Sequence, residues 1–153
     1  AGRHHRGMNR ELFVVFRPDE RALAAIPARH VRETMRPLPL EPLHGAPAFV
    51  SGAAVVRGKV VPVVDAAKLV SGQASTATRW IALQIGTRSA VLAVHQVLGV
   101  QPLDVVKEPA PLLAGAARGA IDELASRDGE LLAILRASRL IDLGEAARGP
   151  DAR

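Results

Sequence analysis

The chain has 153 residues, of which 48% are apolar and only 3% aromatic, so it can build an aliphatic core and is not a disordered chain. It contains no cysteine, which excludes disulfides and thiolate chemistry, and no apolar run approaches the roughly 18 residues that span a bilayer. The net charge is +5, but without Arg3, Arg6 and Arg10 the 20 basic residues fall to 17, against 15 acidic ones. We therefore expect a nearly neutral globular body in the cytoplasm.

Nucleic-acid binding is disfavoured by the same composition. Proteins that bind single strands combine a basic groove with exposed aromatic side chains on which bases stack. Tyrosine is absent here, and the three phenylalanines lie in apolar runs typical of a core. The basic charge is concentrated at residues 1–10, which we expect to form a flexible tail with no hydrophobic signal core. Met8 is a candidate natural start, and residues 148–153 are expected to form a second tail.

The first elements in chain order are expected to be two strands and a helix. Glu11–Arg17 is rich in Val and Phe and predicts a strand, and Ala22–Ile26 predicts a weaker one. Pro27 suits the first position of a helix, and the i, i+4 spacing of Val31 and Met35 predicts that the helix continues to about Arg36. In such a helix Glu33 would be a surface acid within reach of Arg29 or Arg36. A proline-rich link then follows.

The next stretch, PAFVSGAAVVRGKVVPVVD, predicts a β-hairpin. Its two apolar runs, Phe49–Val56 and Val60–Val64, are joined through Arg57-Gly58-Lys59, and Gly58 can supply the positive φ of a tight turn. Because nearly every flanking position is apolar, we expect both faces of this hairpin to be covered and the hairpin to be central. Asp65 ends the second run and is expected to cap a short helix over Ala66–Val70.

The second half of the chain repeats the hairpin pattern. Asp128-Gly129 is the strongest short hairpin signal, and Gly99 inside an apolar run indicates a bulge or bend. A Pro/Gly/Ala loop is expected over Glu108–Gly119. The elements predicted are strands at Trp80–Ile85, Ala90–Val94, Val97–Val105, Ala120–Ala125 and Glu130–Leu135, and a closing helix at Ala137–Ala147. Short hairpins and few helices predict a mostly-β protein of one or two small barrels.

No set of catalytic residues is recognisable. Ser51-Gly52 lacks the nucleophile elbow, and the spacing from Gly52 to Lys59 does not fit a phosphate-binding loop. No two of His30, His44 and His95 have the spacing of metal ligands. We therefore predict no enzymatic activity, no catalytic residues, no cofactor and no metal.

The order of these parts resembles the CheW-like family of bacterial chemotaxis coupling proteins. The resemblance is carried by Val31-x-Glu33, a proline-rich link and the hairpin PAFVSGAAVVRGKVVPVVD. It continues through Val97–Val105, Pro109-Ala110-Pro111 and ELLAILRASRLI, and covers about residues 11–143. The central motif is fairly specific, and its ordered context strengthens it.

The resemblance implies a fold of two intertwined, SH3-like five-stranded barrels with a few short helices, here a single domain over residues 11–147. It also implies a non-enzymatic adaptor that bridges chemoreceptor cytoplasmic tips to the regulatory domain of a histidine kinase, peripheral to membrane receptor arrays. The partner-binding positions that match are Arg57, Val31, Glu33 and Val97. From the residues alone, Val31 and Val97 are as well explained as core residues, and Arg57 as an ordinary turn cation.

This sequence departs from the family pattern at several positions. Val55-Val56 stand where Asn-Leu is usual, Ala66-Ala67 where Leu-Arg is common, and His95 where an acid is usual. These departures leave the fold prediction intact and the exact partner open. The alternatives are the CheW-like regulatory domain of a kinase and a divergent adaptor of a pilus-type or other non-flagellar array. Nothing before Glu11 resembles an ATP-binding or dimerisation domain, which favours a self-contained adaptor.

Overall fold

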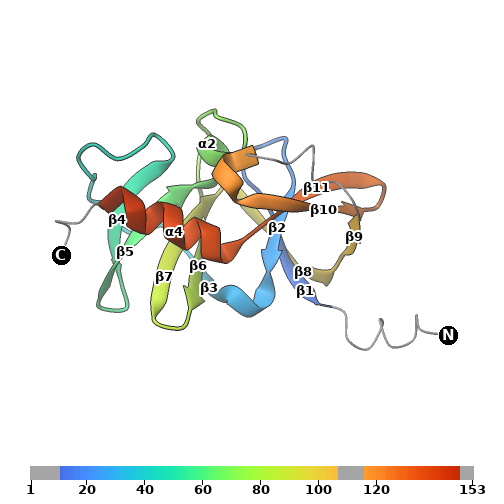
Figure 1. Ribbon diagram of the computed structural model, residues 1–153, viewed down its shortest axis with the longest axis horizontal. Helices are drawn as coiled ribbons and strands as arrows, with labels where there is room; N and C mark the ends of the chain where they lie inside the picture. The colour runs from blue at the N-terminus through green and yellow to red at the C-terminus, as the bar shows by residue number, and fades with distance from the viewer. Residues whose placement is uncertain (1–10, 107–115, 149–153) are drawn as a thin grey trace.

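The computed structural model describes residues 11–106 and 116–148, and within them the chain forms two β-sheets (Figure 1). The six-stranded sheet consists of β1 (Leu12–Arg17), β2 (Ala24–Pro27), β8 (Gln96–Pro102), β9 (Asp104–Val106), β10 (Ile121–Arg127) and β11 (Glu130–Leu135). The five-stranded sheet consists of β3 (Val31–Met35), β4 (Val50–Val56), β5 (Lys59–Asp65), β6 (Arg79–Ile85) and β7 (Arg88–Val94). The helices are η1 (Ala28–His30), α2 (Ala66–Val70), η2 (Ala116–Gly119) and α4 (Ala137–Arg148).

The six-stranded sheet joins the two ends of the chain. Its order is β8-β1-β2-β11-β10-β9, and β2 pairs in parallel with β11. Strands β8 and β9 occupy opposite edges, yet only Leu103 separates them in sequence. The two edges must therefore meet at this residue, which curls the sheet into a barrel. The predicted single strand over Val97–Val105 is thus two strands, and this sheet has six strands rather than the expected five.

The five-stranded sheet is built from one continuous segment. Its order is β3-β6-β7-β5-β4, with β5 and β7 parallel, so β3 and β4 are its two edges. Glu41 and Ala53 exchange two backbone hydrogen bonds of 2.8 Å, which cover part of the β4 edge. Two curled sheets with few helices confirm the predicted mostly-β fold class.

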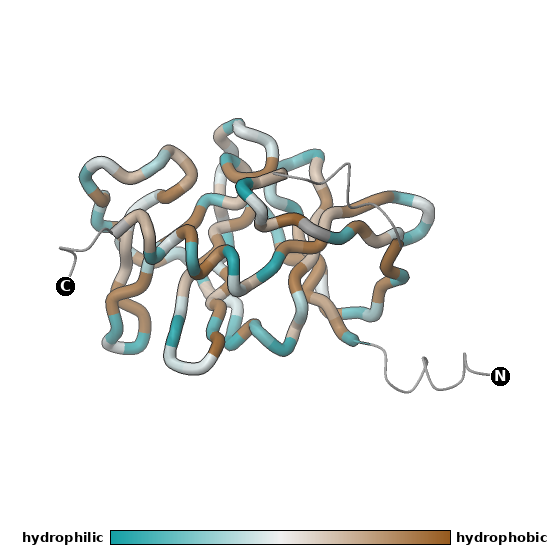
Figure 2. Tube along the Cα trace, in the orientation of Figure 1, coloured by the Kyte–Doolittle hydropathy of each residue, from teal (hydrophilic) through white to brown (hydrophobic). Residues whose placement is uncertain are grey.

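Three apolar clusters explain why the strands are apolar on both faces. Alternate residues of β1 enter different clusters, because successive side chains of a strand point to opposite faces. Phe13 and Val15 pack inside the six-stranded barrel, whereas Val14 and Phe16 join a main cluster that also receives residues from the other sheet and from α4. A third cluster, containing the buried Trp80, fills the five-stranded sheet. Figure 2 shows apolar segments running through the strands of both sheets.

The predicted hairpin turns are confirmed. Arg57 and Gly58 have φ values of 51° and 77°, and Asp128 and Gly129 have values of 51° and 80°. Two successive positive φ angles are the mark of the type I′ turn, whose twist matches that of the flanking strands. Asp65 also caps α2 as expected, because its side chain accepts a hydrogen bond from the Lys68 backbone N–H at 3.1 Å.

Two predictions about the first half of the chain are wrong. The expected helix after Pro27 is limited to the single turn of η1, and Val31–Met35 forms strand β3. The i, i+4 spacing of Val31 and Met35 also fits a strand, in which residues i, i+2 and i+4 share a face. The hairpin β4–β5 is not central either, since β4 is an edge strand and Val55 and Val60 are 61% and 49% exposed. The predicted loop at Glu108–Gly119 lies mostly outside the described residues.

Candidate partner-binding surface

Arg57 and Glu33, two of the predicted partner-binding residues, form an ion pair with each other. The Arg57 Nε donates to Glu33 Oε2 at 2.6 Å and its terminal nitrogen donates to Oε1 at 2.8 Å, so the contact is bidentate. Glu33 lies on β3 and Arg57 at the end of β4, and these strands are the two edges of the five-stranded sheet. The pair therefore bridges the seam where the edges of the curled sheet approach each other.

A β-bulge positions Glu33 for this contact. Strand β3 shifts register against β6 between Val31 and Glu33, so that Val31 lies opposite Leu83 and Glu33 opposite Ala82. Because neighbouring residues of β6 point to opposite faces, the bulge sends Val31 and Glu33 to different faces of the sheet. Val31 packs against the main cluster, and Glu33 is left at the seam. The prediction that Glu33 pairs with Arg29 or Arg36 is therefore wrong, because its partner is Arg57. Arg29 pairs instead with Glu11.

The pair is held together and remains accessible to solvent. The side chains of Arg57 and Glu33 are 58% and 26% exposed. The hydrogen bond from Arg57 lowers the pKa of the Glu33 carboxyl below its ordinary value, and the same bond raises the pKa of the Arg57 guanidinium. Both groups are thus charged at neutral pH, and an exposed pair of this kind contributes little to folding.

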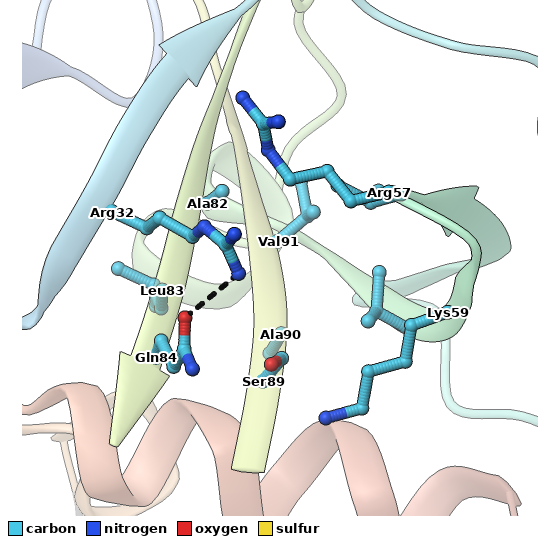
Figure 3. A pocket seen from close by; sticks show the side chains of 11 residues that line it. Arg32, Arg57, Lys59, Ala82, Leu83, Gln84, Ser89, Ala90 and Val91 are labelled. Carbon is cyan, nitrogen blue, oxygen red and sulfur yellow. Dashed lines mark hydrogen bonds between the residues drawn. The ribbon is translucent and has the colours of Figure 1, made fainter. Parts of the chain in front are cut away.

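A small hollow opens beside Arg57 at the mouth of the five-stranded barrel (Figure 3). It has a volume of about 100 Å³, an apolar floor that includes Val56 and Val91, and a rim that includes Arg32 and Lys59. Arg32 is fixed by a 3.0 Å hydrogen bond to the Gln84 side chain, which Figure 3 marks. Sites for small ligands usually enclose at least roughly 300 Å³. The hollow suits a protruding side chain of a partner better than a cofactor.

Val55 and Val60 form an exposed apolar pair on the same hairpin as Arg57, which the sequence analysis missed. They lie directly opposite each other across the β4–β5 ladder. Both were expected to be buried because they belong to long apolar runs. The signal that could have placed them was the strand alternation from the two-residue turn, which sends Val56 and Val61 into the barrel and Val55 and Val60 outward.

The structure does not bring the other two predicted contact residues to the seam. Val31 and Val97 are both partly buried against the main cluster. His95, whose role the sequence left open, lies in a backbone contact, with its Nδ1 3.0 Å from the carbonyl oxygen of Thr76.

Residues 11–106 and 116–148 lack the features of a metal site and of a membrane span. Among the residues whose burial the structure describes, no charged or polar one is buried. No three acidic or histidine side chains of this part lie close enough to hold a metal ion. Among the described helices, none has both the length and the hydropathy needed to cross a bilayer.

Comparison with known proteins identifies the family. The family model for the CheW-like domain matches residues 12–145. The scaffolding protein TtCheW from Thermoanaerobacter tengcongensis has a similar solved structure, with a TM-score of 0.69 and 22% sequence identity over 82% of this chain and 88% of that one. No curated protein sequence matches the chain. Membership of this family, whose solved relative is a scaffolding protein, agrees with the prediction that the chain is not an enzyme. The chain therefore belongs to the CheW-like family of chemotaxis adaptor proteins.

Proposed function

We propose that this protein is an adaptor that couples the cytoplasmic tip of a chemoreceptor to the regulatory domain of a histidine kinase. The observation that carries the proposal is the Glu33–Arg57 pair, an exposed bidentate ion pair at the seam of the five-stranded sheet. Family membership supports the adaptor role. The protein would then work in the cytoplasm, peripheral to a membrane receptor array.

The surface around this pair has the composition of a protein interface. Interfaces combine an apolar centre with a polar rim, and arginine is enriched in them. Here the exposed valine pair, Val55 and Val60, lies beside Arg57 and Lys59 on the same hairpin. Glu33 fixes the Arg57 guanidinium before a partner arrives, which lowers the entropy lost on binding. A carboxylate on the kinase regulatory domain is the group that best complements this hairpin.

Val31 and Val97 are proposed as a second contact region. Each is partly buried and packs on the main cluster, so part of each side chain faces solvent. An aliphatic surface of this type suits the apolar face of a partner helix. We assign this region to the receptor tip and the Arg57 hairpin to the kinase.

The proposal is tested by titrating the purified kinase regulatory domain into wild-type protein and into Arg57→Ala, with calorimetric detection. We expect at least a tenfold loss of affinity and a nearly unchanged thermal midpoint, because an exposed ion pair stabilises the fold little. Arg36→Ala is the matched control, since it removes an equal charge from an exposed position just beyond β3. A large drop in the thermal midpoint of Arg57→Ala, or unchanged affinity, would contradict the proposal.

A charge exchange separates partner contact from simple closure of the barrel. The double variant Glu33→Arg, Arg57→Glu can restore an ion pair across the seam, but it presents the opposite charge on the hairpin. If Arg57 contacts a partner carboxylate, the double variant stays folded and still fails to bind. If the pair only closes the seam, the double variant recovers the binding that each single variant loses.

The alternative functions differ in the partner that the protein would capture. A regulatory domain of a kinase would be recognised by another adaptor, and an adaptor of a pilus-type array would prefer the kinase of that array. Pull-down from the native extract, with identification of the co-purified proteins, tells these apart. Recovery of DNA or RNA at modest salt would overturn the adaptor assignment.

A further inference from the structure

A second surface lies away from the Glu33–Arg57 seam. It is an open groove of about 690 Å³ between α4, the segment η2 and the loop that precedes β4. In Figure 1 this is the region where α4 approaches the teal loop. None of its lining residues lines the hollow beside Arg57. Its volume falls within the roughly 300–1,000 Å³ of sites that hold a small molecule or a few side chains.

The floor of the groove is apolar. Phe49 belongs to the main cluster and is 8% exposed, and Leu143 and Ala147 pack against the same cluster from α4. Pro47 adds a further apolar surface from the loop. An aliphatic side chain placed here would lose its contact with water and gain contact with the edge of the core.

Two arginines form the wall of the groove. The Arg118 guanidinium carbon lies 5.2 Å from the centroid of the Phe49 ring, and Arg139 Nε donates a 2.8 Å hydrogen bond to the Arg118 carbonyl oxygen. Gly119 allows this approach, because a Cβ at that position would lie 3.3 Å from Arg139 Nε. Within the described part of the chain, neither guanidinium has a carboxylate partner, in contrast to Arg57 and Arg88.

The backbone that presents Arg118 is strained. Ala117, Arg118 and Gly119 have successive φ values of 49°, 57° and 84°, and the first two are not glycines. Left-handed conformations are unfavourable for residues with a Cβ and persist where the surroundings impose them, often at binding sites. The strain here places a guanidinium over an aromatic ring at the rim of a groove.

We propose that this groove binds an acidic protein segment in which a carboxylate side chain neighbours an aliphatic one. The carboxylate pairs with Arg118 and Arg139, and the aliphatic side chain covers Phe49 and Leu143. Planar guanidinium groups suit carboxylates because they donate two parallel hydrogen bonds. Nucleic acid fits less well, since Arg118 already covers the ring on which a base would stack and two cations neutralise few phosphates.

The probe is an acetylated and amidated octapeptide of alternating Leu and Glu, titrated into the full chain and followed by NMR shifts of the arginine side-chain N–H groups. The comparison peptide has Gln in place of Glu. We expect the Glu peptide to bind, the Gln peptide to bind at least tenfold more weakly, and the variant Arg118→Gln, Arg139→Gln to lose at least tenfold in affinity. Arg36→Gln, outside the groove, should bind as wild type.

Several results would overturn this inference. The first is that the Glu peptide does not bind, and the second is that both peptides bind with equal affinity. The third is that the groove variant, Arg118→Gln with Arg139→Gln, keeps the thermal midpoint and the peptide affinity of the wild type. If the groove variant unfolds, the single variant Arg139→Lys, which keeps the charge but removes the fork, must still weaken binding. If the variant Arg118→Gln, Arg139→Gln loses binding to phosphatidylglycerol vesicles or to a single-stranded oligonucleotide but keeps its affinity for the Glu peptide, the arginines bind a lipid surface or nucleic acid instead. Self-association abolished by Arg118→Gln would assign the groove to a second copy of the chain.

Discussion

Gly52→Ala should destabilise the protein strongly, because Gly52 lies where β4 meets the preceding segment. Its φ is +148°, in a region that residues with a Cβ rarely adopt. An added Cβ would lie 2.4 Å from the carbonyl oxygen of Glu41, which is backbone and cannot rotate away. The same oxygen accepts the 2.8 Å hydrogen bond from the Ala53 N–H. An alanine must therefore push residue 41 off the sheet edge and break the contact between Glu41 and Ala53.

The cost follows from these contacts. The backbone strain costs about 1–3 kcal/mol, and the two backbone hydrogen bonds between Glu41 and Ala53 contribute about 1 kcal/mol each. We expect Gly52→Ala to lower the free energy of unfolding by about 3–5 kcal/mol, a large part of the 5–15 kcal/mol typical of a domain. Gly58→Ala is the matched control, with φ +77° and no atom within 4 Å of the added Cβ, and should lose only about 1–2 kcal/mol.

Urea unfolding followed by fluorescence of Trp80 measures both variants. Trp80 is the single tryptophan and is 2% exposed, so its emission reports loss of the five-stranded sheet. The slope of the unfolding free energy against urea must match the wild type for the comparison to hold. If the two variants differ by less than about 0.5 kcal/mol, the close contact with Glu41 does not limit this position and the reasoning is refuted.

Three further predictions concern other parts of the chain. Arg88 donates hydrogen bonds to Asp142 at 2.5 Å and Glu145 at 2.7 Å, both on α4. Arg88→Ala should therefore speed amide hydrogen exchange in α4. Unchanged exchange rates would show that packing alone holds this helix in place. The backbone N–H groups of Ala22 and Arg21 lower the pKa of Asp19 below its ordinary value of 3.8, so its stabilisation is complete above that pH and is lost as pH falls through the lowered pKa. Asp19→Asn should therefore show a shallower loss of stability below pH 3.8 in acid titrations of the urea midpoint, and an unaltered profile would exclude this carboxylate. Deleting residues 1–10 should leave the thermal midpoint nearly unchanged and remove most affinity for anionic surfaces; DNA binding that survives the deletion would lie in the body.

Local sequence signals predicted the hairpins well because their determinants are local. Arg57-Gly58 and Asp128-Gly129 each combine a residue that tolerates positive φ with a glycine, and both form two-residue turns. The cap at Asp65 and the closing helix after Ala137 are likewise decided by a few neighbouring residues. Where an element depends on neighbouring residues along the chain, the sequence alone was sufficient to predict it.

The prediction failed at Val31–Met35 because a five-residue window cannot separate two periodicities. Val31 and Met35 share a face in a helix and also in a strand. Pro27 favoured the helix, but this segment forms a strand because it pairs with β6, which lies about 50 residues later in the sequence. The Glu33–Arg57 pair was missed for the same reason, since it depends on β3 and β4 being the two edges of one sheet. The family resemblance placed both residues at a contact surface without indicating that they contact each other.

The shared sheet at the ends of the chain has a consequence for synthesis. Strands β1 and β2 are made first, but their partners β8 and β11 are made only with residues 96–135. The five-stranded sheet between them needs no later residue than Val94 and can form while translation continues. Strand β1 can pair with β2 at once, but more than half of the chain must be synthesised before its second partner, β8, exists. During that interval Phe13 and Val15 lack most of the cluster that later covers them, because Leu103, Ala125, Leu132 and Ile134 are made afterwards.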